Sequence, residues 1–414
     1  MNVKRLKYLL LIATALTFAR VVSFDFVALD DEKHLLYSRE SISAHWERPY
    51  LKLYIPLTYT AWSLIGEVSS HPAVFHAANL ALHLFNVWLV WNLFALTGAS
   101  AAAVFMAAAI FALHPMQAEP VAWVSGLRDV LSAALFLSAL LLLRRAPPTS
   151  IRIAIVTTLY FFALTAKPNA VVFPAVAYLL TPRGERREII PWIVAWIFLA
   201  LPFFWITEKN QYFGFPVPTV FDRTIVATDA IGFYLHKFVW PLSLAPDYGR
   251  APYRVVAHPF SIYLLLGVAT LVSALFAAAR RILWPMLALV FLLPTLGFIA
   301  FVFQTTSTLA DRYVYLAMIG IGFGVLRLGK KVPFALAVGL ALFLSIGSFR
   351  QTGFWKDTPT LLRHTVSVNP ESWVAWHNLG VWHERRGELA EAERCYLEEK
   401  RFRPAFVTRA AETR

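Results

Sequence analysis

Apolar stretches long enough to cross a lipid bilayer recur along almost the whole of this 414-residue sequence. A helix needs about 20 mainly apolar residues to cross the hydrocarbon core, where its backbone polar groups must be satisfied internally. We identify eleven such stretches, at residues 6–24, 75–96, 99–113, 130–143, 151–166, 171–180, 189–206, 260–279, 282–303, 313–326 and 332–348. The sequence therefore predicts an all-α, polytopic membrane protein of about eleven transmembrane helices.

The composition supports a membrane protein and argues against a nucleic-acid partner. Hydrophobic residues make up 58% of the chain and charged residues only 15%, against about 25% charged residues in soluble proteins. The formal net charge of +13 comes from short Lys and Arg runs between the apolar stretches. Such runs are typical of cytoplasmic loops and not of a nucleic-acid-binding surface. The single cysteine, Cys395, excludes an intrachain disulfide.

The basic runs also predict the orientation in the membrane. Crossing at each stretch places four runs on the same side as the basic residues at 4–7, namely those at 144–152, 183–187, 280–281 and 327–331. By the positive-inside rule this side is the cytoplasm. We therefore expect a multi-pass protein of a bacterial inner membrane or an ER-type membrane, with a cytoplasmic N-terminus. A crossing at 54–65 would invert every later loop, so we expect an interfacial helix there and at 224–240.

This orientation leaves several substantial regions on the extracytoplasmic side, at residues 25–74, 114–129, 207–259, 304–312 and from about 350 onward. We expect the chemistry to face outward, in a membrane domain of residues 1–349. The tail of residues 350–414 is more highly charged and has a helical pattern.

Within this tail, residues 373–406 carry the signature of one tetratricopeptide repeat, in Trp376, Leu379, Gly380, Ala392, Tyr396 and Pro404. His383 and Glu399 depart from it, because Tyr and Ala are usual there. A single repeat cannot bury its own apolar face. We expect that the helices after Arg350, including 360–368, cap it, or that it docks on a protein partner or on the membrane domain. A generic amphipathic hairpin without a partner is the alternative.

Two adjacent carboxylates, Asp30 and Asp31, follow the first apolar stretch. A solvated loop would explain them. The functional alternative is that one acts as a general base while the other positions it or a divalent metal ion. Neighbouring carboxylates repel one another, which splits their pKa values and favours one proton-accepting partner.

The region 114–129 concentrates ionisable groups between two apolar stretches, with His114, Glu119 and Arg128 among them. Ionisable residues at such a position are costly and usually functional. A structural salt bridge between Glu119 and Arg128 is the alternative.

Three further cations lie on the predicted outer face, namely Arg48, Lys167 and Arg312. Phosphate recognition uses fixed cationic donors of this kind. Alternatively, such long side chains extend to the membrane interface without a ligand.

Together these strings resemble the transmembrane and tetratricopeptide-repeat-containing O-mannosyltransferases (TMTC-type), within the GT-C superfamily of glycosyltransferases. The matching pieces run in family order over almost the whole chain: Leu29–Asp31, Pro56–Leu64, Phe75–His83, His114–Ser132, Lys167–Ala170, Pro246–Tyr248, Asp311–Leu316, and Asn369–Pro370 leading into Asn378–Gly380. Gln117, Pro168 and Asp311 depart from the residues common in the family, and the tail carries one clear repeat instead of a long array.

The resemblance implies a GT-C-like fold and transfer of a sugar, typically mannose, from a polyprenyl-phosphate donor to a protein Ser/Thr or a glycan hydroxyl, with inversion. It makes Asp30 or Asp31 the base, and it makes five residues contacts of the lipid phosphate or acceptor: His114, Glu119, Arg128, Lys167 and Arg312. A metal ion, if one takes part, would lie at the acidic pair. The alternative function is a non-catalytic membrane scaffold that recruits partners through the tail.

Overall fold

The computed structural model describes residues 3–146, 149–211, 218–327 and 332–407, and these fold into helices with no β-strand among them. The all-α class expected from the sequence is confirmed. Lys330 and Lys331, which belong to the last predicted basic run, lie outside the described residues.

Each of the eleven predicted stretches contains a helix. Six helical segments of the described chain are long and apolar enough to cross a membrane. They are built on α1 (Val3–Phe18), α5 (Pro72–Ala95), α8 (Leu127–Arg145), α11 (Arg186–Gln211), α14 (Ile262–Ala279) and α17 (Phe334–Thr352). A seventh is a pair bent by 45°, in which α6 (Ala101–Leu113) leads into a segment containing α7 (Ala118–Ala122). The shorter apolar helices are α9 (Ser150–Ala166), α10 (Phe173–Leu180), α15 (Trp284–Leu292) and α16 (Ala317–Leu326).

One predicted stretch, 282–303, is helical only in its first half. Its α-helix ends at Leu292, and a short 3-10 turn then runs to Thr295. Pro294 lies in that turn, and a proline cannot continue the helical hydrogen-bond ladder. The prediction of a full-length span over 282–303 is therefore wrong in its C-terminal half.

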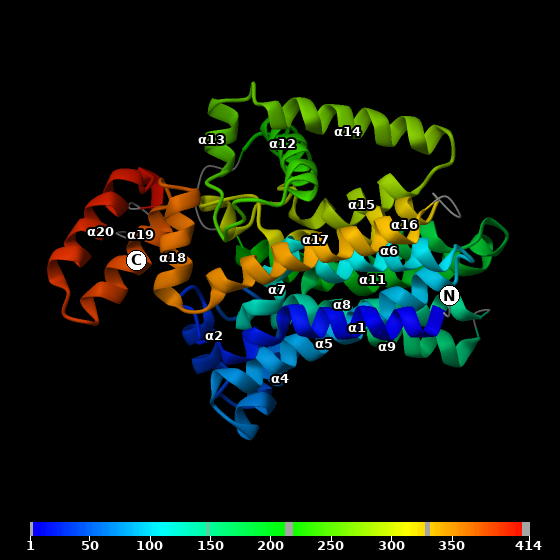
Figure 1. Cartoon of the computed structure of the whole chain (residues 1–414), viewed down its shortest axis with the longest axis horizontal. Helices are drawn as coiled ribbons and strands as arrows, with labels where there is room; N and C mark the ends of the chain where they lie inside the picture. Colours follow the sequence, from blue (N-terminus) through cyan, green and yellow to red (C-terminus); the bar gives the residue numbers. More distant parts are fainter. Residues whose placement is uncertain (1–2, 147–148, 212–217, 328–331, 408–414) are drawn as a thin grey trace.

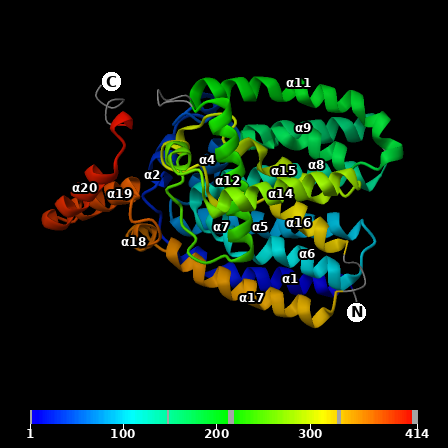
Figure 2. The same ribbon diagram turned by 90° about the horizontal axis from the view of Figure 1, so that it is seen from above.

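The long helices run side by side, with the tail at one end of the bundle and the N-terminus at the other (Figures 1 and 2). Helix α8 lies in the interior, whereas α14 and α11 cover the outside and leave much of their apolar surface exposed. Such exposure is costly in water but suits contact with lipid.

The regions predicted to be extracytoplasmic meet at the tail end of the bundle. The backbone N–H of Ala28 donates to Thr358 Oγ1 at 2.9 Å, the backbone N–H of Thr308 donates to the Arg250 carbonyl at 3.0 Å, and Ser125 binds Asp31. These segments are far apart in the sequence, so their contacts define one polar end, as the alternating topology requires. Which side of the membrane this end faces stays a prediction from the basic runs.

Further helices build much of this polar end: the short helices α2 (Asp31–Tyr37), α3 (Ile42–Glu47), α4 (Pro56–Val68) and α13 (Pro252–Ala257), and the longer α12 (Val220–Val239). Helices α4 and α12 form where interfacial helices are expected, and neither is among the long apolar segments. Helix α12 packs closely on α14, because a Cβ at Gly232 or Gly267 would overlap a backbone carbonyl of the other helix.

The tail contains α18 (Thr358–Val368) and a hairpin of α19 (Trp373–Glu384) and α20 (Leu389–Phe402). Gly380 leaves room for the Tyr396 ring where the two hairpin helices meet. Helix α18 covers the hairpin through an apolar cluster of Leu362, Ala375, Leu379 and Cys395. The two departures from the repeat pattern are both paired, His383 with Glu388 and Glu399 with His377.

The tail also docks on the membrane domain. The Ser372 hydroxyl donates to Asp247, and Arg254 forms an ion pair with Glu371. His364 Nε2 contacts the Leu244 carbonyl at 2.8 Å. Of the expected ways to cover the hairpin, two therefore operate together, namely capping by α18 and docking on the membrane domain.

Candidate functional site

The segment that follows α6 is folded into the polar end of the bundle. Pro115 follows His114, and the chain bends there because proline lacks a backbone N–H and disfavours helical geometry in the residue before it. The His114 ring stacks on Phe238, its Nε2 lies 3.0 Å from the Phe238 carbonyl, and its Nδ1 accepts from the Met116 N–H at 3.3 Å. Both ring nitrogens are engaged, so His114 holds the bend.

This bend brings Glu119, on α7, against Arg312, which lies in the 3-10 turn Asp311–Val314. Arg312 Nη1 donates to Glu119 Oε1, and the Arg312 backbone N–H donates to Oε2 at 3.2 Å. Both residues are buried. The salt bridge between Glu119 and Arg128 that the sequence offered as an alternative is therefore not formed. Glu119 pairs instead with Arg312, 193 positions away.

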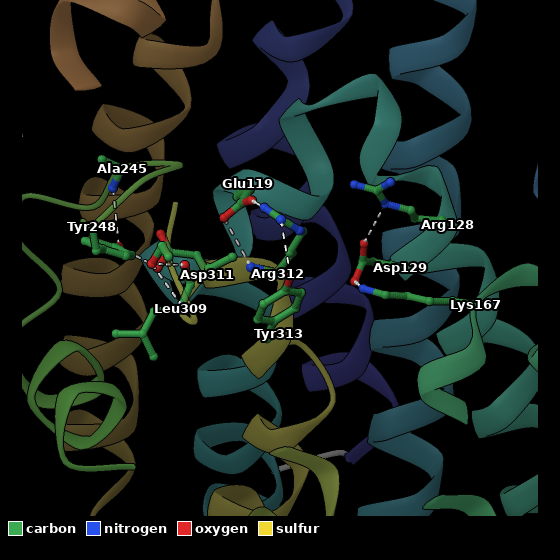
Figure 3. Close-up of polar contacts among 12 residues, drawn as sticks. Glu119, Arg128, Asp129, Lys167, Ala245, Tyr248, Leu309, Asp311, Arg312 and Tyr313 are labelled. Carbon is green, nitrogen blue, oxygen red and sulfur yellow. Dashed lines mark hydrogen bonds and ion pairs between the residues drawn. The ribbon is translucent and has the colours of Figure 1, made fainter. Parts of the chain in front are cut away.

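A second ion pair joins Lys167 at the end of α9 to Asp129 at the start of α8, and Arg128 Nε lies 3.9 Å from the other Asp129 oxygen. Figure 3 shows these groups beside the Arg312–Glu119 pair, with Asp129 between Arg128 and Lys167. Their side chains are nearly inaccessible, at 4% exposure for Asp129 and 13% for Lys167.

Two aromatic rings connect the cations. The Arg128 and Arg312 guanidinium groups lie 4.9 and 5.3 Å from the centre of the Trp123 ring. Arg312 and Lys167 lie 4.8 and 5.4 Å from the centre of the Tyr313 ring. Arg128, Lys167 and Arg312, which we call the cation cluster, therefore converge although they come from three separate parts of the chain.

The charges of this cluster do not cancel. Its three cations face two carboxylates, Glu119 and Asp129. A third acid, Asp311, accepts a hydrogen bond from the Tyr248 hydroxyl at 2.6 Å. Burial, together with the nearby charge of Glu119, raises the pKa of Asp311 well above its usual value and favours its neutral form. The site therefore keeps an excess positive charge, which favours an anionic ligand.

The acidic pair lies beside the cation cluster, and its two members differ. Asp31 is 1% exposed. Its Oδ1 accepts from the Ser125 N–H at 3.0 Å and from the Ser125 hydroxyl, and its Oδ2 accepts from the Val27 N–H at 3.1 Å. Burial raises the pKa of Asp31 to about 6, although these hydrogen bonds oppose the shift. Asp31 therefore joins the first outer loop to the segment that carries Glu119 and Arg128.

Asp30 precedes helix α2, and its side chain has no hydrogen bond within the described chain. It is half-buried and lines a cavity of about 240 Å³. Burial lowers the pKa of His34 to about 4, and the charges of both Asp30 and Arg128 act on this same ring. Asp30 is therefore the free carboxylate of the pair, within electrostatic reach of the cation cluster.

Arg48 lies apart from this arrangement. Its side chain is 64% exposed and pairs with Glu40 at 2.9 Å. Among the described residues no group of three or more His, Cys, Asp or Glu side chains is placed to hold a metal ion.

Sequence reasoning missed the contributions of Ser125, Tyr248 and the two rings. Trp123 and Ser125 belong to the singled-out region 114–129, so their position carried a signal. The hydrogen bond from Ser125 to Asp31 joins residues 94 positions apart, so no local sequence pattern predicts it.

The fold and site define a multi-pass helical membrane protein in which the buried cation cluster lies beside the acidic pair Asp30 and Asp31. No known family profile matches the sequence. The chain is 30% identical over 131 residues to the protein O-mannosyl-transferase Tmtc2 of Drosophila melanogaster, a match that covers 27% of this chain and 14% of the fly protein. The crystal structure of ArnT from Cupriavidus metallidurans bound to undecaprenyl phosphate aligns with 94% of this chain and 74% of that chain, at 15% identity and a TM-score of 0.40.

Proposed function

We propose that this protein is a membrane glycosyltransferase that moves a sugar from a polyprenyl-phosphate donor to a hydroxyl acceptor at the polar end of the bundle. The observation that carries the proposal is the cation cluster tied to a free carboxylate through the Asp31–Ser125 contact. The partial similarity to an O-mannosyl-transferase supports mannose as the sugar and a protein Ser/Thr as the acceptor.

In the proposed reaction the cation cluster holds the donor phosphate. As the bond between the anomeric carbon and the phosphate oxygen breaks, negative charge grows on the departing polyprenyl phosphate. Preorganised cations in a water-poor site stabilise such charge strongly. Arg312 supplies a planar donor set and Lys167 a compact charge. Glu119 and Asp129 hold these two cations in position.

Asp30 is the proposed base. All the carboxylate hydrogen bonds of the pair go to Asp31, so Asp30 has both oxygens available for an acceptor hydroxyl. The hydroxyl oxygen would attack the anomeric carbon while its proton passes to Asp30. A single displacement of this kind inverts the anomeric configuration and needs only one base.

Release of polyprenyl phosphate from polyprenyl phosphate mannose by the purified, reconstituted protein, with a Thr-containing peptide or an oligosaccharide supplied as the hydroxyl acceptor, tests this function. We expect Asp30→Asn to lower turnover at least about 100-fold, the usual contribution of a general base. Glu40→Gln is a matched control, because Glu40 is an exposed carboxylate of the same loop. A parallel measurement with EDTA decides whether a divalent metal ion takes part.

Failure of the folded wild-type protein to release polyprenyl phosphate from any of several donor sugars would refute the proposal. The remaining hypothesis would then be a non-catalytic scaffold. One observation favours that alternative, because Leu389 and Leu397 expose 67% and 62% of their surface on α20.

A further inference from the structure

We propose that the tail positions Arg312 of the cation cluster through the loop of residues 244–250, which we call the coupling loop. This inference rests on the proposed function and adds a positioning role of the tail to it. The tail sets the affinity for the donor phosphate, although none of its residues belongs to the cation cluster. The coupling loop lies between the tail and the turn that carries Arg312, and hydrogen bonds join it to both.

The tail holds the coupling loop at two of its residues. The Leu244 carbonyl accepts from Gln351 Nε2 at 2.9 Å, and His364 Nε2 lies 2.8 Å from the same oxygen. The Ser372 hydroxyl donates to Asp247 Oδ2, and both residues are buried. These tail groups come from the end of α17, from α18 and from the start of α19. Three successive helices therefore fix the position of the loop.

One carboxylate joins the tail to the turn inside the coupling loop. Asp247 Oδ1 accepts from the Gly249 N–H at 2.7 Å, while Oδ2 accepts from the Ser372 hydroxyl. Gly249 has a φ of 63°, which side chains rarely adopt, and a Cβ there would lie 2.9 Å from Asn369 Nδ2. Tyr248 lies between these two loop residues. The direction of its side chain is therefore set by a turn that the tail contacts on either flank.

On its other side the coupling loop holds the turn that carries Arg312. The Tyr248 hydroxyl donates to Asp311 Oδ1 at 2.6 Å. The Thr308 N–H donates to the Arg250 carbonyl at 3.0 Å. Figure 3 shows Tyr248, Asp311 and Arg312 following one another across the site. Since Asp311 directly precedes Arg312, the loop fixes this turn at two points.

The hydrogen bond from Tyr248 also keeps the guanidinium group of Arg312 available for a phosphate. Asp311 is 2% exposed, and the charges of Lys237 and Arg312 both act on it. Lys237 Nζ already donates to the carbonyls of residues 242–243. A buried carboxyl group that loses its donor needs another partner, so without the Tyr248 hydroxyl the Asp311 side chain would turn to Arg312. It would then compete with the donor phosphate.

The first measurement is the Kd of the reconstituted full-length protein for a polyprenyl phosphate. Tyr248→Phe removes the hydroxyl and keeps the ring, and Ser372→Ala removes the tail donor without altering the coupling loop itself. We expect each to raise the Kd about tenfold, equivalent to about 1.4 kcal/mol, because Asp311 then competes for Arg312. Ser372→Thr keeps a hydroxyl at this position, so its Kd should stay within about twofold of wild type.

The coupling also predicts that the two substitutions are not independent. Ser372→Ala combined with Tyr248→Phe should raise the Kd no further than Tyr248→Phe alone, since both act through the same hydrogen bond to Asp311. A rise of about 100-fold, the product of two independent tenfold effects, would overturn the proposal.

A matched control separates positioning from loss of a helix cap. Ser372 also caps α19, because its hydroxyl oxygen accepts from the Ala375 N–H at 3.3 Å. Asp357 caps α18 in the same way, by accepting from the Thr360 N–H at 2.9 Å, and it has no hydrogen bond to the coupling loop within the described residues. Asp357→Ala should therefore leave the Kd within about twofold of wild type.

Amide hydrogen exchange of the turn gives a readout that needs no ligand. The backbone N–H groups of Thr308, Ala310 and Arg312 all donate hydrogen bonds within the protein. We expect them to exchange faster in Ser372→Ala than in wild type, because the turn loses a fixed neighbour and opens more often. Asp357→Ala should exchange there as wild type does.

The outcomes separate the two proposals. An unchanged Kd and unchanged exchange in folded Tyr248→Phe and Ser372→Ala would overturn the positioning role and leave the glycosyltransferase function standing. Equal effects of Ser372→Ala and Asp357→Ala would also overturn it, since the tail would then act only through its own stability. If the wild type releases no polyprenyl phosphate from any donor, the proposed function fails, and hydrogen exchange still decides whether the tail positions the turn.

Discussion

The contact between Asp31 and Ser125 predicts a pH dependence that one substitution should move. The ionised Asp31 carboxylate accepts three hydrogen bonds and joins the first outer loop to the segment that carries Glu119. With a pKa of about 6, Asp31 gains a proton below that pH, and the protonated oxygen no longer accepts equally from these donors. We therefore expect donor release to fall about tenfold per pH unit below about pH 6.

Ser125→Ala removes the hydroxyl donor and leaves the two backbone N–H donors in place. The Ser125 hydrogen bond lowers the pKa of Asp31, so its loss raises that pKa and moves the acid limb to higher pH. A hydrogen bond to a charged group contributes about 1.5–3 kcal/mol, which corresponds to a shift of about 1 to 2 pH units. Ser63→Ala is the control, since the Ser63 hydroxyl bonds the Ser38 carbonyl and not Asp31.

Stability should change with pH in the opposite direction, which separates this effect from unfolding. A carboxyl group whose folded pKa is raised from 3.8 to about 6 favours the folded state most below its unfolded pKa. That contribution, about 3 kcal/mol at 1.36 kcal/mol per pKa unit, is lost as the pH rises through about 6. Activity would thus rise over the range in which this contribution to stability falls. An acid limb at the same pH in wild type and Ser125→Ala would refute the reasoning.

Two further predictions concern the buried ion pair and the topology. Arg312→Met leaves the Glu119 carboxylate buried without its cation, so we expect a loss of about 3–5 kcal/mol in unfolding free energy. The double variant Arg312→Met with Glu119→Leu should recover stability in thermal denaturation without recovering donor release. Equal stability of the single and double variants would contradict this prediction. In a Cys395→Ser background, Glu393→Cys on exposed α20 should react with a membrane-impermeant maleimide added to the extracytoplasmic side, and Arg145→Cys at the end of α8 should not; the reverse pattern would invert the topology.

The sequence predicts where helices form because the bilayer imposes a simple rule on them, although four of the eleven predicted spans form shorter apolar helices that are not among the membrane-crossing segments of the described chain. A run of apolar residues must be a helix in lipid, so each of the eleven stretches contains one. The rule says less about where a helix ends. The stretch at 282–303 is apolar throughout, yet Pro294 and the turn around it end the helix early.

The candidate site is only partly readable from the sequence, because its pairings join distant residues. Arg128 and Arg312 are both basic residues of predicted outer regions, and only the packed fold makes Arg312 the partner of Glu119. Likewise, Asp30 and Asp31 are indistinguishable in the sequence. The difference arises because Val27 and Ser125 direct their donors at Asp31 alone.

The contact between Ala28 and Thr358 spans 330 positions, and it has a consequence for the order in which the molecule is completed. A ribosome makes the first outer loop before the helices of the bundle that follow it, and the tail after them. The loop therefore lacks its contact with the tail while the intervening helices are inserted. A chain interrupted before α18 would contain the acidic pair and the whole cation cluster, but no cavity beside Asp30.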